Sequence, residues 1–159
     1  MMRSRCLTIN ALLLACIAAV SGCKSDKTTA PKVESYTAAL SGSNETTPPA
    51  LIIGATGNST ITVNGHDNTY TLGTANFASG TTAPGSSSLT LPAHIHLGAP
   101  GVAGGIMVPL TATMDGTTTG TITVADSVLA HMRAGDAYVN VHTAARPGGE
   151  IRGQLVRVQ

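Results

Sequence analysis

The chain has 159 residues, with 9 Lys and Arg against 8 Asp and Glu, no tryptophan and only 3% aromatic residues. This near-neutral balance lacks the basic surplus typical of nucleic-acid binding, so we exclude nucleic acid as a partner. Threonine, valine and glycine are abundant. Because Thr and Val favour strands and Gly supplies turns, the composition predicts an all-β domain.

The N-terminal segment has the pattern of a bacterial lipoprotein signal. Arg3 and Arg5 precede an apolar run, residues 7–20, that is too short for a comfortable membrane span. Small residues then stand directly before Cys23, in VSGC, which resembles the lipobox. We therefore predict a signal peptide at residues 1–22, lipidation of Cys23 and a flexible, lipid-anchored tether at residues 23–34. An ordinary secretory signal and a retained anchor helix are the alternatives.

A lipid on Cys23 would hold the protein to a membrane surface without spanning it. We expect a bacterial cell-envelope protein that faces the periplasm or the cell surface. The outer membrane is favoured over the inner one because Lys24, not an acidic residue, follows Cys23. Cys6 and Cys16 leave with the signal, so no thiol remains for a disulfide or a thiolate metal site.

Residues 35–159 are predicted to form one domain of short strands joined by turns. Asn64-Gly65 is a strong hairpin signal, and Pro92 indicates an edge strand or a bulge partway along its strand. Asp126 is expected to cap the single short helix, which Gly135 would end. The expected strands cover residues 35–40, 57–63, 69–77, 88–97, 106–111, 117–124, 137–143 and 149–158, with a loop at 78–87. This spacing predicts a single antiparallel β-sandwich.

Three histidines fall on predicted strands in a pattern that suggests a metal site. His94 and His96 lie one residue apart, so their side chains share one face of a strand. In AYVNVHT the valines suit the core, which leaves His142 on the polar face with Tyr138 and Asn140. If the two strands are close, three imidazoles converge, and imidazole suits both copper and zinc. The alternative is that the histidines are structural and make ordinary hydrogen bonds.

Other polar residues have mainly structural interpretations. Glu150 and Arg152 share a face of the last strand, and we favour pairing with each other or with neighbours over a functional role. The alternative places Glu150, and likewise Asn140, behind the histidines, where they would orient a ligand imidazole. His66 follows a turn and His131 lies on the helix, so both are expected at the surface. Met107, in a short apolar strand, is expected in the core.

Several motifs resemble the CHRD domain, the domain named after chordin. They are HIHLG with PGVAGG, YVNVHT, and RPGGEIRGQL, preceded by LSGSNETTPP, which is similar to the family's opening. The resemblance covers about residues 36–158, with one departure at Thr47, before the Pro48-Pro49 pair. It implies a β-sandwich. In animals the family belongs to extracellular antagonists of bone morphogenetic proteins, so it also implies a non-catalytic protein-interaction module.

The histidine spacing is in addition similar to the copper site of copper-zinc superoxide dismutase, which uses H-x-H on one strand and a later strand histidine. This likeness favours an immunoglobulin-like Greek key or a superoxide-dismutase-like sandwich, and copper ahead of zinc. The bridging histidine and the zinc ligands have no counterpart here, so a full dismutase is not expected. We predict copper binding by His94, His96 and His142, with the interaction module as the alternative. An enzyme ranks third because no separate acid-base residue is evident, and no pattern sets the oligomeric state.

Overall fold

The computed structural model describes residues 32–46, 54–77 and 89–159. The predicted signal peptide, the predicted lipidation site Cys23, most of the predicted tether and the expected loop at 78–87 lie outside these residues. Within the three described ranges, no helix is both long enough and apolar enough to cross a membrane.

The described residues form nine strands that pair into one antiparallel sheet. The order across the sheet is β5-β4-β7-β8-β1-β2-β3-β6, and β9 pairs with β1. The elements are β1 (Glu34–Ser41), the 3₁₀ turn η1 (Gly42–Asn44), β2 (Thr56–Val63), β3 (Asn68–Ala75), β4 (Thr90–Leu97), β5 (Ile106–Thr113), β6 (Thr117–Ile122), α1 (Asp126–Ala134), β7 (Ala137–Val141), β8 (Ile151–Gln154) and β9 (Val156–Arg157). The predicted all-β class with one short helix is confirmed.

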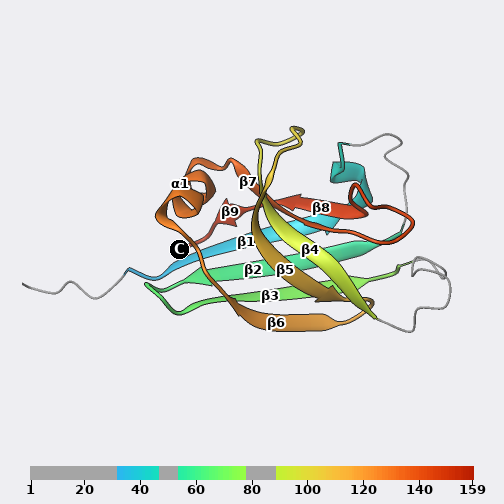
Figure 1. The fold of residues 1–159 in the computed structure, drawn as a ribbon, viewed down its shortest axis with the longest axis horizontal. Helices are drawn as coiled ribbons and strands as arrows, with labels where there is room; N and C mark the ends of the chain where they lie inside the picture. Colours follow the sequence, from blue (N-terminus) through green and yellow to red (C-terminus); the bar gives the residue numbers. More distant parts are fainter. Residues whose placement is uncertain (1–31, 47–53, 78–88) are drawn as a thin grey trace, which may run out of the picture.

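The sheet curls until its two halves face each other. Strands β4 and β5 cross in front of β1, β2 and β3 (Figure 1). The end strands β5 and β6 meet across a tight turn, and the Tyr70 hydroxyl on β3 reaches the Thr111 hydroxyl on β5 at 3.0 Å. The expected sandwich is therefore made of two layers of one continuous, nearly closed sheet. Apolar side chains from both layers fill the space between them, including Tyr36, Ile61, Leu72, Ile95, Val139, Val141 and Ile151, each 0% exposed.

Two of the predicted turn and cap signals are confirmed. Gly65 has φ 60° in the hairpin between β2 and β3, where Asp67 N–H donates to Asn64 O at 3.0 Å. Gly135 ends α1 in the left-handed conformation, with φ 80°. The predicted cap at Asp126 is wrong, because Ala125 occupies the N-cap position without a side-chain hydrogen bond. Asp126 is instead the first helical residue, where a negative charge favours the helix dipole.

Of the two alternatives that Pro92 indicated, an edge strand or a bulge, the edge strand is wrong and the bulge is present. Strand β4 lies between β5 and β7, although its pairing with β5 does carry a bulge, between Ile95 and His96. The ladder between β4 and β7 ends at Ala93, and Pro92 O accepts a hydrogen bond from His142 N–H at 2.9 Å. In an antiparallel strand a residue's N–H and C=O point to the same side. Proline has no backbone N–H to donate, and at position 92 this donor would lie just beyond the end of the ladder, so no ladder hydrogen bond is lost.

The last predicted strand is divided in two. Strand β8 pairs with β7, whereas β9 pairs with β1. Between them, Leu155 turns its N–H to Ala137 O at 2.9 Å and is 1% exposed. The C-terminal motif therefore connects the layer that carries β4 and β7 to the layer that carries β1.

Candidate metal centre

Strands β4 and β7 are neighbours, as the histidine pattern requires. In their antiparallel register His94 lies opposite Asn140, and His96 lies opposite Tyr138. Ile95 and Val139, on the other face, are 0% exposed in the core. The period-2 geometry of strands therefore places the histidines on the outer face of the sheet.

The structure brings the imidazoles of His94, His96 and His142 together. One ring nitrogen from each lies within 4.8 Å of the others, and burial is partial for His94 and His142. His94 Nδ1 is 3.0 Å from His142 Nε2. Since metal–imidazole bonds are about 2.0–2.1 Å, two adjacent ligand nitrogens on one ion lie about 3–3.4 Å apart. This pair already has that spacing, and the three nitrogens form a group that can hold a metal ion.

Backbone carbonyls orient two of the three rings. His96 Nδ1 lies 2.9 Å from Gly104 O, and His142 Nδ1 lies 3.0 Å from Pro147 O. Because a carbonyl oxygen only accepts, each Nδ1 carries the hydrogen and each Nε2 keeps its lone pair. His96 Nε2 is buried and has no hydrogen-bond partner among the described residues. A histidine that donates its second ring N–H to a carbonyl is the usual arrangement behind a metal ligand.

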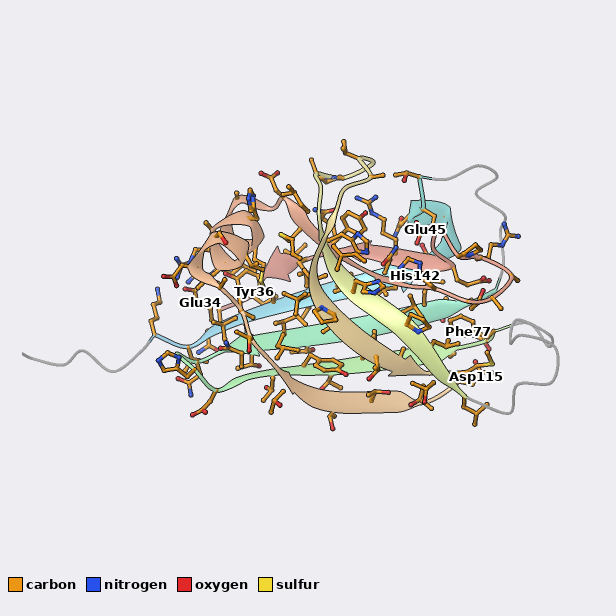
Figure 2. All side chains as sticks on the ribbon, viewed as in Figure 1. Glu34, Tyr36, Glu45, Phe77, Asp115 and His142 are labelled. Carbon is orange, nitrogen blue, oxygen red and sulfur yellow. The ribbon has the colours of Figure 1, made fainter. Side chains whose placement is uncertain are left out.

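The surroundings of His94 and His142 favour the neutral, metal-binding form of these two rings. Burial lowers the pKa of His94, and the neighbouring His142 and His96 lower it further. Burial also lowers the pKa of His142, against the opposing effect of its hydrogen bond to the Pro147 carbonyl. Neutral imidazole has the lone pair that a metal ion requires. His142 faces the outer side of the sheet close to β4 and β8 (Figure 2).

Tyr138 and the loop between β4 and β5 complete the wall beside His96. The Tyr138 ring stacks on the His96 ring, with centroids 5.0 Å apart, and its hydroxyl accepts a hydrogen bond from Gly104 N–H at 3.2 Å. A Cβ at Gly104 would lie 1.7 Å from Leu97 O. Only glycine therefore allows the loop to fold back so closely. Sequence reasoning missed this support, and its only local signal was the glycine-rich stretch that follows HIHLG.

The other predicted polar residues lie near the cluster but do not hold its rings. Glu150 accepts a hydrogen bond from the Thr143 hydroxyl at 2.7 Å, and the described contacts include none between Glu150 and an imidazole. Asn140 is 2% exposed, and its Oδ1 has no partner among the described residues. Arg152 donates to two carbonyls of the 98–105 loop rather than to Glu150.

The remaining histidines and Met107 lie apart from the cluster. His66 is exposed in the β2–β3 turn, as predicted, and His131 is half-buried on α1. Met107 is partly buried against the hydrophobic core, which agrees with the structural interpretation.

An all-β domain with three converging imidazoles on the outer face of a curled sheet defines a candidate metal-binding protein. The family profile of the CHRD domain matches residues 36–155, and the chain belongs to this family. No curated protein and no solved structure matches the chain. The likeness to superoxide dismutase therefore depends on the histidine spacing alone.

Proposed function

We propose that this CHRD domain binds one copper ion through His94, His96 and His142. The observation that carries the proposal is the convergence of three ring nitrogens, two of which have a lone pair that a carbonyl hydrogen bond directs. Copper bound here would be stored or transferred. A free coordination position would also give dioxygen or superoxide access to the ion.

The donor set supports copper ahead of zinc. All three donors are imidazoles, and no thiolate or carboxylate belongs to the group. Imidazole suits both metals, but Cu²⁺ binds a given nitrogen site more tightly than Zn²⁺ in the Irving–Williams order. The buried, unpartnered Nε2 of His96 supports a bound ion in general, because a buried acceptor without a partner costs stability.

The proposal includes a location. The lipobox-like VSGC supports a lipid on Cys23 and attachment of the protein to the bacterial envelope, with the outer membrane favoured by Lys24. The domain would then stand at the end of a short tether, residues 23–34, with the histidine cluster accessible from the aqueous side.

A second candidate function is a protein-interaction module, and one surface feature favours it. Three apolar side chains are exposed on the loop that supports His96. Leu97 and Ile106, at its two ends, are 38% and 60% exposed, and Val102, in its middle, is 54% exposed. Exposed apolar side chains grouped in this way are typical of contact surfaces. Under this alternative the histidines would only support the loop.

The first experiment is a Cu²⁺ titration of the full chain in detergent, with electron paramagnetic resonance of the loaded protein. We expect one ion per chain with hyperfine splitting from imidazole nitrogen. His142→Ala should weaken Cu²⁺ binding at least about tenfold. His66→Ala, which removes an exposed histidine outside the cluster, is the matched control and should bind as the unmodified chain does.

Equal Cu²⁺ affinity in His142→Ala and His66→Ala would reject the copper site. If His142→Ala instead lowers only the melting temperature of the metal-free protein, the histidines are structural and the interaction module becomes the better explanation.

A further inference from the structure

A pocket lies on the same side of the molecule as the histidine cluster, but none of the three histidines lines it. It has a volume of about 480 Å³ and lies between η1 with its following residues, the start of the 98–105 loop, and β8. Its lining includes Glu45, Arg152 and Gln154. This volume falls within the range of pockets that hold small organic molecules.

The pocket contains a buried positive charge that forms no salt bridge with a described residue, although it opposes the rise that burial causes in the pKa of nearby Glu45. Arg152 is 2% exposed, and its Nη2 donates to Ala99 O at 3.1 Å and to Val102 O at 2.9 Å. Its Cζ lies 3.4 Å from the centre of the Tyr138 ring. Its Nη1, however, is buried and has no hydrogen-bond partner among the described residues, whose ion pairs all involve Glu34. A buried cation is costly unless it is paired, so an anion is what this position lacks.

A second polar atom indicates that the missing ligand also carries a donor. Gln154 Nε2 donates to Gly98 O at 2.9 Å and to Gly135 O at 2.7 Å, which fixes the orientation of the amide. Its Oε1 can only accept, yet it is buried without a partner among the described residues. A hydroxyl or ammonium group of a ligand would satisfy it.

Glu45 sets the charge that the pocket accepts. Its carboxyl group rests against Gly149, where a Cβ would lie 2.5 Å from Oε1, and this oxygen has no partner among the described residues. Burial raises the pKa of Glu45 to about 7. A ligand with two negative charges would be repelled by the ionised form of Glu45, whereas a monoanion can share the pocket with the protonated form.

We propose that this pocket binds a small organic carboxylate bearing a hydroxyl or ammonium group, of the 2-hydroxy acid or 2-amino acid class. The carboxylate pairs with Arg152 Nη1, and the donor group of the ligand faces Gln154 Oε1. The site is independent of the copper proposal, because none of its lining residues is a histidine.

The test is calorimetric titration of the full chain in detergent, with a chelator present so that the histidine cluster is free of metal. Lactate and serine are the probes, lactamide and glycerol are the uncharged controls, and inorganic phosphate at about pH 8, where most of it is the dianion, is the dianionic control. We expect saturable binding of lactate or serine, one per chain, and no binding of lactamide, glycerol or phosphate.

Two variants connect the binding to this pocket. Arg152→Lys should weaken lactate or serine binding at least about tenfold, because lysine cannot reproduce the fixed position of Nη1. Ser43→Phe, at an exposed lining position, should block the pocket without disturbing the core, whereas Thr119→Phe, at an exposed position on β6, should not. Ser43→Phe keeps the proposal testable if Arg152→Lys fails to fold.

Three results would overturn the proposal. The first is that neither lactate nor serine binds, and the second is that lactamide or phosphate binds as tightly as lactate. The third is that Ser43→Phe binds lactate or serine as the unmodified chain does. His142→Ala should bind lactate or serine as the unmodified chain does. The copper proposal can therefore fail in its own titration while the carboxylate proposal succeeds, and the carboxylate proposal can fail while the copper proposal succeeds.

Discussion

The inner face of β4 is buried over most of its length, whereas its outer face is buried only in part and is built differently. On the inner face Ile95 and Val139 are 0% exposed and contact other apolar side chains. On the outer face Asn140 and Arg152 are 2% exposed and His96 is 7% exposed, and each has a buried polar atom without a partner among the described residues. Unsatisfied polar atoms cost stability. The comparison teaches that the inner face stabilises the fold, whereas the outer face carries the unsatisfied polar groups on which both binding proposals rest.

The largest effect is expected at two adjacent residues of β4, one of which should determine stability and the other Cu²⁺ binding. Ile95→Ala removes an apolar side chain from the core and should lower the free energy of unfolding by about 2–5 kcal/mol. His96→Ala should cost less stability in the metal-free protein but remove Cu²⁺ binding. Urea unfolding with a chelator, together with Cu²⁺ titration, measures both. Equal loss of stability in the two variants would show that the outer face is also structural.

The next effect concerns a residue that supports the cluster without belonging to it. Gly104→Ala would drive a Cβ into Leu97 O and displace the carbonyl that orients His96. We expect about 10–100-fold weaker Cu²⁺ binding, the range found when a group behind a metal ligand is lost. Gly105→Ala is the matched control, because its Cβ would meet no atom within 4 Å. Similar Cu²⁺ affinities in the two variants would contradict a role for this carbonyl.

The same contrast holds for two carboxylates near the opposite ends of β1, and both are labelled in Figure 2. Glu34 accepts hydrogen bonds from Arg133 Nε at 3.0 Å and from the Tyr36 hydroxyl at 2.6 Å. Glu45 has an oxygen without a partner among the described residues. The two groups should therefore affect stability with opposite dependence on pH.

For Glu34, the hydrogen bond to Arg133 lowers the pKa to about 2, against the opposing effect of burial. Its contribution is present above the ordinary carboxyl range and is lost as the pH falls towards 2. Glu34→Gln should therefore lower the melting temperature at pH 7, and the difference from the unmodified chain should shrink as the pH falls. Thermal unfolding from pH 7 to pH 2 checks this, and a pH-independent difference would contradict it.

The smallest effect is expected at Glu45, where burial raises the pKa to about 7. A raised pKa contributes stability below the ordinary carboxyl pKa, and this contribution is lost as the pH rises to about 7. The unmodified chain should therefore lose stability between about pH 4.5 and pH 7 relative to Glu45→Gln. Urea unfolding at pH 5 and pH 8 measures the change, and a change of the opposite sign would show that Arg152 controls this carboxyl.

The strand pattern was predictable because alternation and turn residues are local signals. They located most strands, the Asn64-Gly65 hairpin and the end of the helix at Gly135. At Pro92 they left an edge strand and a bulge both open, because whether a strand lies at an edge depends on β7, which is distant in the sequence. They failed at Asp126, because the helix begins at Asp126 itself, one residue earlier than a side-chain cap at this position would require.

The candidate site was predictable to the same extent. The period of two put His94 and His96 on one face and His142 on a matching one, and the pairing of β4 with β7 brought them together. The carbonyl of Gly104 and the stacking of Tyr138 depend on how the 98–105 loop folds back. No local pattern specifies that path, so these supports became visible only in three dimensions.

The near closure of the sheet has a consequence for how the protein behaves when it is crowded. An open strand edge is a template on which another chain can add a strand. Along β5, however, Thr111 N–H donates to the Tyr70 hydroxyl at 3.2 Å, and Thr113 O accepts from the Thr74 hydroxyl at 2.6 Å. Side chains of β3 thus occupy backbone groups that a second copy would need. A second copy of the chain should therefore have little tendency to add a strand at this edge, even at high concentration.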